Sequence, residues 1–227
     1  MASLDPARTM QRLPLPVDRL RDRLRHIHWI GGGSGAGKST VAQRLAGIYG
    51  VRMYSCDEQQ SQHMPRLNPI DHPLVHAFLA MDMDERWLRR TPEEMLSTFH
   101  RFHGEGFELI IEDLLALPPD ELVVVEGYQL RPPLIVPLMH ENSRAVYLLP
   151  TPDFRRKVLT ARGSHFTSQT SDPRRAMEKL LERDAMYTDI VRHEAIEAGL
   201  PAIEVDGGVS VDSLVERVAC GLGLKAS

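Results

Sequence analysis

The stretch GGSGAGKS at residues 32–39 decides the fold. It fits the pattern GxxxxGK followed by serine or threonine. An apolar run precedes it at residues 26–30, and a helix-forming run follows at 40–46. Glycines allow a tight turn whose backbone N–H groups converge on one phosphate, in conformations that a Cβ atom would block. The sequence therefore predicts a strand, a phosphate-binding loop and a helix, in that order.

The loop and the first helical turn are expected to bind the phosphates of a nucleoside triphosphate, with ATP as the nucleotide. Lys38 would reach the β- and γ-phosphates, and the Ser39 hydroxyl would bind Mg²⁺. The helix that begins there adds its positive dipole end to the anion site. The alternative, a glycine-rich turn that happens to precede a helix, does not explain the lysine, the serine and the strand together. The expected nucleotide contacts are Gly33, Ser34, Gly35, Ala36, Gly37, Lys38, Ser39 and Thr40.

Short apolar runs alternate with longer segments along the chain. The runs lie at residues 26–30, 51–55, 122–125, 145–149 and 202–205. Segments long enough for crossover helices separate them, which is the pattern of a parallel sheet covered on both faces. We expect one α/β domain over residues 1–227, built on a five-stranded parallel sheet.

Helix signals place the segments around this sheet. Thr91 and Glu94 flank Pro92 in a capping box, and the helix is expected to end about three turns later at Gly104. An Asp-Pro pair opens another helix at residue 172, and a last amphipathic helix follows residue 210. Residues 58–118 form a mainly helical insert. Because sites on such sheets lie at the carboxyl ends of the strands, the insert should form one wall of the site.

Composition excludes several classes of protein. The 227 residues include 27 basic and 31 acidic side chains, for a net charge of −4, so no basic face is expected for nucleic acid. The two cysteines, Cys56 and Cys220, lie far apart in sequence and are expected to be reduced thiols of a cytoplasmic protein. No apolar run is long enough for a signal peptide or a membrane span. A monomer or homodimer is expected.

The absence of two motifs argues against two classes of P-loop protein. The NKxD string of switch GTPases and the LSGGQ string of transporter-type ATPases do not occur. With its loop after the first strand and an arginine-rich segment late in the chain, the sequence resembles the P-loop small-molecule and nucleotide kinases. The string EGYQLRP at residues 126–132 is similar to EG-x-x-L-x-P of 2-phosphoglycerate kinase-like proteins, and zeta-toxin-like kinases are a second local resemblance. The resemblance implies a three-layer P-loop kinase fold with a helical insert and a lid.

Two carboxylates follow predicted strands. In the kinases that this sequence resembles, an aspartate at the position of Asp57 orients the acceptor hydroxyl and accepts its proton. Glu126 ends an apolar run that looks like a Walker B strand, and it would hold Mg²⁺ through water or act on the acceptor. The two roles could be exchanged. The structural alternatives are a helix-capping Asp57 and a surface Glu126. Tyr128 and Arg131 lie near the same strand end and could contact the acceptor.

The segment from Thr151 to Arg183 carries eight basic and four acidic residues. Kinases like this one close a lid whose arginines neutralise charge on the γ-phosphoryl oxygens. The resemblance places the lid at residues 162–183, with Arg162 leading into it. Arg175 and Arg183 share one side of the late helix. The alternative is a solvated helix face. We expect at least one of Arg162, Arg175 and Arg183 to reach phosphate.

The insert has the opposite charge, with five arginines and eleven acidic residues. This count favours a neutral or cationic acceptor, although solvated helix faces would give the same count. The sequence therefore predicts an ATP-dependent phosphotransferase that moves the γ-phosphoryl group to a hydroxyl of a small molecule. Lys38, Asp57, Glu126 and the lid arginines would be its catalytic residues. The alternative is a nucleotide-binding switch or sensor ATPase without a small-molecule acceptor.

Overall fold

The computed structural model describes residues 5–140 and 144–224, and its centre is one parallel sheet of five strands. The strand order is β2-β3-β1-β4-β5, and all four pairings are parallel. The strands are β1 (Ile27–Gly32), β2 (Arg52–Ser55), β3 (Val123–Glu126), β4 (Ala145–Pro150) and β5 (Ala202–Val205). The predicted parallel sheet is confirmed, with small shifts at the strand ends.

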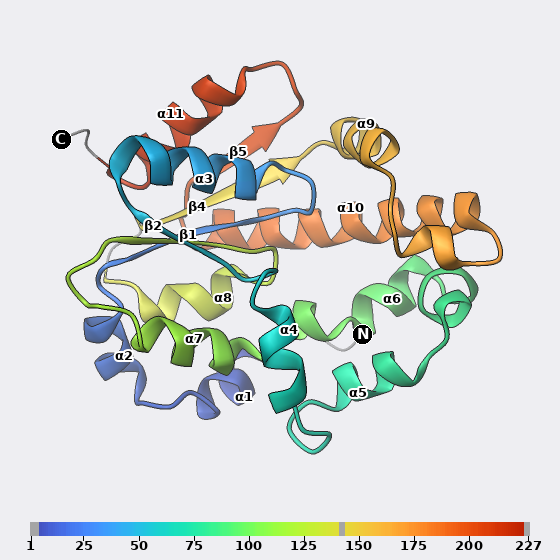
Figure 1. Cartoon of the computed structure of the whole chain (residues 1–227), viewed down its shortest axis with the longest axis horizontal. Coiled ribbons are helices and arrows are strands. Elements are labelled where there is room, and N and C mark those ends of the chain that lie inside the picture. The colour runs from blue at the N-terminus through green and yellow to red at the C-terminus, as the bar shows by residue number, and fades with distance from the viewer. Residues whose placement is uncertain (1–4, 141–143, 225–227) are drawn as a thin grey trace.

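Two helices cover one face of the sheet, α3 (Lys38–Tyr49) and α11 (Val211–Gly221) (Figure 1). Their apolar stripes pack on Ile30, Val124 and Val146 of the three central strands. The helix that follows the phosphate loop is therefore fixed to the sheet along its length, which holds its first turn in place.

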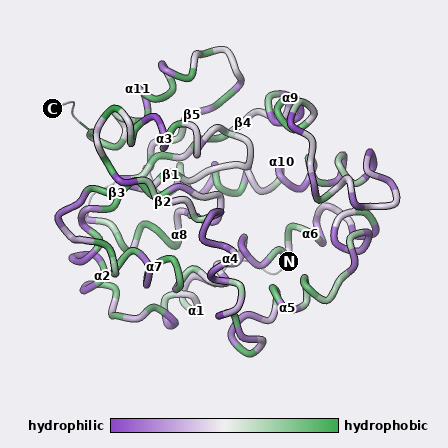
Figure 2. Tube along the Cα trace, in the orientation of Figure 1, coloured by the Kyte–Doolittle hydropathy of each residue, from purple (hydrophilic) through white to green (hydrophobic). Residues whose placement is uncertain are grey.

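The longest helix, α10 (Pro173–Glu197), lies on the other face with α2 (Val17–Arg23), α7 (Phe107–Leu115) and α8 (Pro132–Ile135). This side contains the larger core, which includes Trp29 and Tyr147 from the sheet and Tyr187 from α10. Figure 2 shows hydrophobic residues along α7, most of which are buried. With helices on both faces, the molecule has the predicted three layers.

Residues 58–118 are mainly helical, as predicted. Their elements are α4 (Gln60–His63), the 3₁₀ helix Met64–Arg66, α5 (Pro73–Ala80), the π-helical turn Glu85–Arg89, α6 (Pro92–Thr98), the 3₁₀ helix His100–His103 and α7. The capping box of Thr91 and Glu94 is present. The helix that it opens ends at Thr98, however, and not at Gly104. Phe99 takes an extended conformation, and Gly104, at φ 75°, ends the short 3₁₀ helix that follows.

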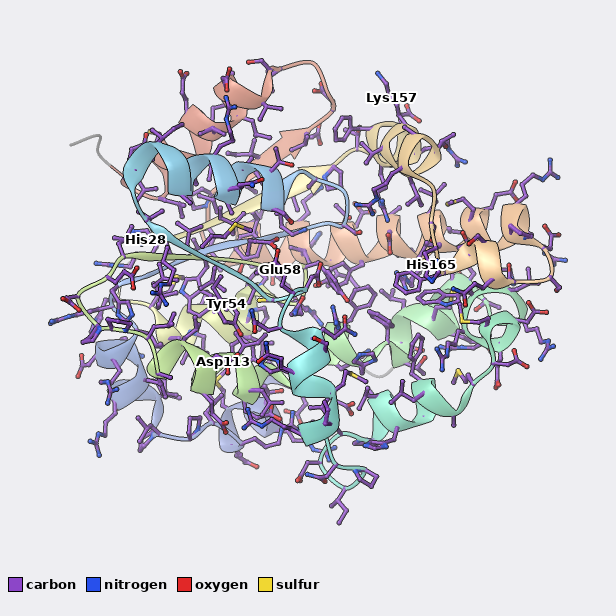
Figure 3. The ribbon with its side chains drawn as sticks, in the orientation of Figure 1. His28, Tyr54, Glu58, Asp113, Lys157 and His165 are labelled. Carbon is purple, nitrogen blue, oxygen red and sulfur yellow. The ribbon has the colours of Figure 1, made fainter. Side chains whose placement is uncertain are left out.

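The insert is attached to the sheet through a buried polar cluster. The Tyr54 hydroxyl on β2 donates to Asp113 Oδ2 of α7 at 2.6 Å, and His63 Nε2 lies 2.7 Å from the same oxygen. Figure 3 shows Tyr54 and Asp113 side by side. Burial and the bond to Asp113 raise the pKa of Tyr54, so the phenol stays protonated. These bonds fix the start of the insert where β2 ends.

The remaining helices are α1 (Pro6–Gln11), the 3₁₀ helix Val136–Leu138, α9 (Pro152–Arg162) and the 3₁₀ helix Thr167–Gln169. The helix predicted after Asp172 is α10, capped by the Asp172 side chain. Cys56 and Cys220 are both free. Within residues 5–140 and 144–224, no helix has the length and apolar character that crossing a membrane requires.

His28 on β1 is expected to make the stability of the fold pH-dependent (Figure 3). Burial, with Arg144 nearby, lowers the pKa of His28 to about 4. An unfolded histidine titrates near 6.5, so between these values the unfolded chain binds the extra proton. The unfolding free energy should therefore fall as the pH drops, by about 2 kcal/mol from this residue at pH 5. Urea unfolding at pH 7.5 and 5.0 measures this change in the unfolding free energy.

The matched comparison is His28→Gln against His193→Gln on the exposed side of α10. The first variant should lose part of the pH dependence, because position 28 no longer carries an imidazole that can be protonated in the unfolded chain. The second should keep it. Equal pH dependence in wild type and His28→Gln would contradict the assignment.

Candidate active site

The phosphate loop joins β1 to α3 and is built on glycine conformations. Gly32, Gly35 and Gly37 have φ values of 120°, 77° and 82°, which L-residues rarely adopt. Gly33 is required for a different reason, since a Cβ atom there would lie 2.5 Å from Thr188 Oγ1 of α10. The loop is thus pressed against α10, and its backbone conformation agrees with the prediction.

Lys38 is the first residue of α3 and is only 6% exposed. Its Nζ donates to the carbonyl oxygen of Gly33 at 2.7 Å, so the side chain folds back over its own loop. Burial lowers the pKa of Lys38, and the carboxylates of Glu126 and Asp57 act in the opposite direction. An anion bound in the loop would add to their effect and favour the charged ammonium.

A cavity of about 530 Å³, the nucleotide pocket, extends from the loop to the segment between β5 and α11. Loop residues 34–40 line one end, and Ser39 and Thr40 are exposed there. Apolar residues line the other end: Phe154, Val158, Val205, Val209, Val211 and Leu214. A polar, glycine-rich end and an apolar end suit the phosphates and the base of a nucleotide.

Both predicted carboxylates line this pocket, at different depths. The Asp57 side chain is 54% exposed. Glu126 at the end of β3 is 1% exposed and accepts a 2.6 Å hydrogen bond from Ser55 Oγ. The two strand ends are adjacent, because Ser55 of β2 pairs with Glu126 of β3. The two carboxylates, each expected to follow a strand, therefore lie at the same edge of the sheet.

Arg101 of the insert joins Asp57 to Tyr128. Its Nη1 donates to Asp57 Oδ1 and to the Tyr128 hydroxyl, each at 2.8 Å. Burial raises the pKa of Tyr128 to about 12, against the effect of Arg101, so the phenol is neutral at physiological pH. The sequence analysis missed Arg101 as a site residue. Its only signal was a basic residue in an acidic insert, and the 44 positions between it and Asp57 hid the contact.

The donor set near the loop fits Mg²⁺. Ser39 and Glu126 offer a hydroxyl and a carboxylate oxygen, the hard ligands that Mg²⁺ prefers. Over the described ranges 5–140 and 144–224, no three His, Cys, Asp or Glu residues gather into a metal cage. That arrangement suits an ion held by one or two protein oxygens, water and substrate phosphates.

A second cavity of about 400 Å³ lies between the insert, α9 and α10, and we name it the acceptor pocket after the role proposed for it below. Six aromatic residues line it: Trp87, Phe99, Phe102, Tyr128, Phe166 and Tyr187. Ser34, Tyr128 and Arg162 line both pockets, so the two cavities meet beside the phosphate loop.

A buried carboxylate connects two arginines of the acceptor pocket. Asp184 of α10 accepts from Arg155 Nη2 of α9 at 2.6 Å and from Arg183 Nη2 at 2.6 Å. Burial alone would raise the pKa of Asp184, but the two guanidinium groups outweigh it and hold the pKa below its ordinary value. Arg155 also lies against the phosphate loop, since a Cβ atom on Gly35 would be 2.8 Å from Arg155 Nη1.

The sequence analysis did not single out Arg155 or Asp184. Arg155 belongs to the arginine-rich segment, but it lies seven positions before Arg162, the end of α9 where a lid arginine was expected. Asp184 follows Arg183 directly, and no sequence signal distinguishes it from a surface residue of the late helix. Only the packing of α9 on α10 brings the two together.

The predicted basic residues have different positions. Arg162, the last residue of α9, is exposed and lines both pockets. Arg183 is buried in the acceptor pocket. Arg175 is exposed and borders neither pocket. Arg131 is also outside both, because its guanidinium binds the Glu194 carboxylate and the Phe102 carbonyl. Its predicted acceptor contact therefore has no support from this geometry.

The acidic residues of the insert are largely occupied within the insert and at its borders. Glu105 accepts from the backbone N–H groups of Leu74 and Val75, and Glu108 pairs with His72. Others pair with Arg66 and Arg89 or cap α6. The net charge of the insert thus does not describe the pocket, because the one carboxylate in its described lining is Asp184 of α10.

Comparisons with known proteins found similar solved structures but no matching family. No protein-family model matches the sequence, and no curated protein is similar to it. Among solved structures, deoxyadenosine kinase from M. mycoides with bound dATP is 13% identical, with a TM-score of 0.48 and coverage of 87% of this chain and 99% of that chain. An uncharacterized protein from Eubacterium ventriosum is 17% identical, with a TM-score of 0.44 and coverage of 87% and 97%. The NadR protein in complex with NAD and AMP-PNP is 16% identical, with a TM-score of 0.40 and coverage of 92% and 52%.

The fold class follows from the topology itself. A parallel five-stranded sheet with β1 at its centre, a phosphate loop between β1 and α3, and helices on both faces define the P-loop kinase type of α/β fold. The predicted fold class is confirmed.

Asp184 should be important for stability. Its removal leaves Arg155 and Arg183 buried without their shared carboxylate, so Asp184→Ala should lower the unfolding free energy by about 3–5 kcal/mol. Asp189→Ala is the control on the same helix, because that side chain is 78% exposed and lies 3.9 Å from Arg192. It should change stability by less than about 0.5 kcal/mol. Urea unfolding compares the two, and equal losses would contradict a structural role for the buried pairs.

Proposed function

We propose that the protein is an ATP-dependent phosphotransferase that moves the γ-phosphoryl group to a hydroxyl of a small molecule. The supporting observation is that the nucleotide pocket and a second, aromatic pocket meet beside the phosphate loop and share Ser34, Tyr128 and Arg162. A γ-phosphoryl group at the end of the loop would face the second pocket. An enzyme that only hydrolyses ATP needs no second cavity of this size.

Positioning and charge stabilisation account for most of the catalysis in phosphoryl transfer. Residues 33–40 would bind the triphosphate, and the Lys38 ammonium would move from the Gly33 carbonyl to the β- and γ-phosphates. Ser39 and Glu126 would hold Mg²⁺, which supplies positive charge beside the phosphate oxygens. Arg155 and Arg162 would stabilise the charge that spreads over the transferring group.

Asp57 is the better candidate for the base. Its side chain is half-exposed at the nucleotide pocket beside Tyr128, which lines both cavities, whereas Glu126 is buried beneath Ser55. As the acceptor oxygen bonds to the γ-phosphorus and the bond to the bridging oxygen breaks, Asp57 would accept the hydroxyl proton. Arg101 would hold the carboxylate in place.

The direct test is incubation of the protein with γ-labelled ATP, Mg²⁺ and pools of hydroxyl compounds. Transfer of label to an organic product supports the proposal. Label found only in inorganic phosphate would overturn it and leave the switch or sensor ATPase as the better hypothesis.

Lys38→Ala should lower the rate of phosphoryl transfer by at least about 10², because one preorganised positive charge at the phosphates is lost. The fold should remain, since the glycine conformations do not depend on this side chain. Lys157→Ala, on the outer side of α9 (Figure 3), is the control and should keep full activity. Rates and circular dichroism spectra of both variants are the measurements. An unfolded Lys38→Ala protein would contradict the separation of binding from folding.

Asp57→Asn and Glu126→Gln should separate the two carboxylates. The first variant should lose turnover while it binds MgATP as tightly as wild type, because only proton acceptance is lost. The second should need a higher Mg²⁺ concentration for half-maximal rate, because a charged ligand is lost. Magnesium titrations of the rate, with calorimetry of nucleotide binding, measure both. A higher Mg²⁺ requirement in Asp57→Asn and not in Glu126→Gln would reverse the assignment.

A further inference from the structure

Aromatic residues lie on two sides of the acceptor pocket. Buried aromatic residues of the insert form one side, the aromatic floor, and an exposed aromatic residue lies on the lid segment, residues 162–183. Trp87 and Phe99 of the insert are buried, with ring centroids 6.3 Å apart. Phe166, between α9 and α10, is 56% exposed, and its ring stacks at 30° on Trp87 with a centroid distance of 5.6 Å. An exposed phenylalanine at the opening of a pocket is a stacking surface that a ligand can cover.

Direct bonds hold this lid segment to the insert. Ser171 donates its backbone N–H and its hydroxyl to the carboxylate of Asp84, at 2.7 and 2.6 Å. Lys179 Nζ donates to the carbonyl oxygens of Leu88 and Arg90, both at 2.7 Å. The position of Phe166 over Trp87 is therefore fixed by polar contacts on both sides of the Trp87 segment.

Besides Nε and Nη1 of Arg155, which lies against the phosphate loop, two donors in the pocket wall have no partner among the described residues. Trp87 Nε1 and Arg183 Nη1 are buried and form no hydrogen bond with any described residue. The Arg183 guanidinium lies 4.8 Å from the Phe99 ring centroid and 5.2 Å from those of Trp87 and Phe102. Buried donors are nearly always satisfied, so two unsatisfied ones in one pocket wall indicate a ligand with acceptor atoms.

Among the described residues, the three arginines of the pocket are placed for the triphosphate or paired with Asp184. Arg155 lies against Gly35 and Arg162 lines the nucleotide pocket, so both are placed for the triphosphate. Arg183 donates twice to Asp184 Oδ1, and Arg155 donates to Oδ2 of the same carboxylate, so the charge of Arg183 is compensated within the protein. A second anion beside the triphosphate would be repelled without a counter-charge of its own.

We propose that the acceptor is an uncharged hydroxyl compound with a flat heteroaromatic ring, which stacks on Phe166 over the insert's aromatic floor. Acceptor atoms on the ring edge take the N–H groups of Trp87 and Arg183. Base–aromatic stacking of this kind is common where proteins bind flat heterocycles. The identity of this molecule as the phosphoryl acceptor rests on the proposed function. The ring site itself rests only on the pocket.

The test measures binding in the presence of Mg²⁺ and the non-hydrolysable analogue AMP-PNP. The ring probes are adenosine, guanosine, cytidine, uridine and pyridoxine. Ribose and glycerol are hydroxyl compounds without the ring, and the 5′-monophosphates of the four nucleosides carry the added charge. At least one ring probe should raise the melting temperature and change the fluorescence of Trp87 in a Trp29→Phe background. Ribose and glycerol should do neither, and each monophosphate should bind more weakly than its nucleoside.

Phe166→Ala should weaken binding of the ring probe about tenfold and leave the affinity for AMP-PNP unchanged, since Phe166 borders only the acceptor pocket. Phe166→Tyr should restore it, because a ring is present again. Ile70→Ala, at a residue 83% exposed elsewhere on the insert, is the control and should bind like wild type.

The outcomes separate the two proposals. Failure to bind AMP-PNP would remove the proposed function. Normal binding of AMP-PNP with no effect from any ring probe would overturn the ring site alone. The ring site would also be overturned if ribose bound as tightly as the ring probes, or if a monophosphate bound more tightly than its nucleoside. Full affinity of Phe166→Ala for a bound ring probe would overturn the ring site too.

Discussion

The close contact between the phosphate loop and its neighbours is the constraint on which the rest of the site depends. A Cβ atom on Gly31 would lie 2.3 Å from Tyr147 of β4, and one on Gly33 would lie 2.5 Å from Thr188 of α10. The Thr188 hydroxyl donates to the Asp184 carbonyl, and the Asp184 carboxylate holds Arg155 next to the loop. The loop glycines thus allow α10 to pack closely against the loop, and the Asp184 carboxylate of α10 holds Arg155 beside the loop.

The sheet could be predicted because its signals are local. The three central strands lie in short apolar runs and are buried on both faces, which is the usual pattern of parallel strands. Asp57 and Glu126 could be placed together for the same reason, since both follow strands of one parallel sheet. The predicted end of α6 was wrong. Gly104 fits the sequence pattern of a helix C-cap, but the chain leaves the helix at Phe99, where the sequence has no glycine or proline to indicate an end.

The rest of the site depends on tertiary contacts, which a single sequence does not display. Arg101 reaches Asp57 across 44 positions, and Arg155 reaches Asp184 across 29. Arg131 follows a strand end, as a substrate residue should, yet Glu194 of α10 takes up its guanidinium. The net charge of the insert did not predict the charge of the pocket either. The total charge of a segment does not show which side chains are already paired in helix caps and ion pairs.

Arg183 shows how one side chain can serve both stability and specificity. Its cation lies among three aromatic rings and beside Asp184, and this arrangement satisfies its charge without a ligand. Its remaining donor is nevertheless unpaired, as is that of Trp87. A pocket that only completed the core would place apolar atoms at these positions, since leaving buried donors unsatisfied costs stability. The unpaired donors therefore favour a pocket shaped for a polar, flat ligand over a simple packing defect.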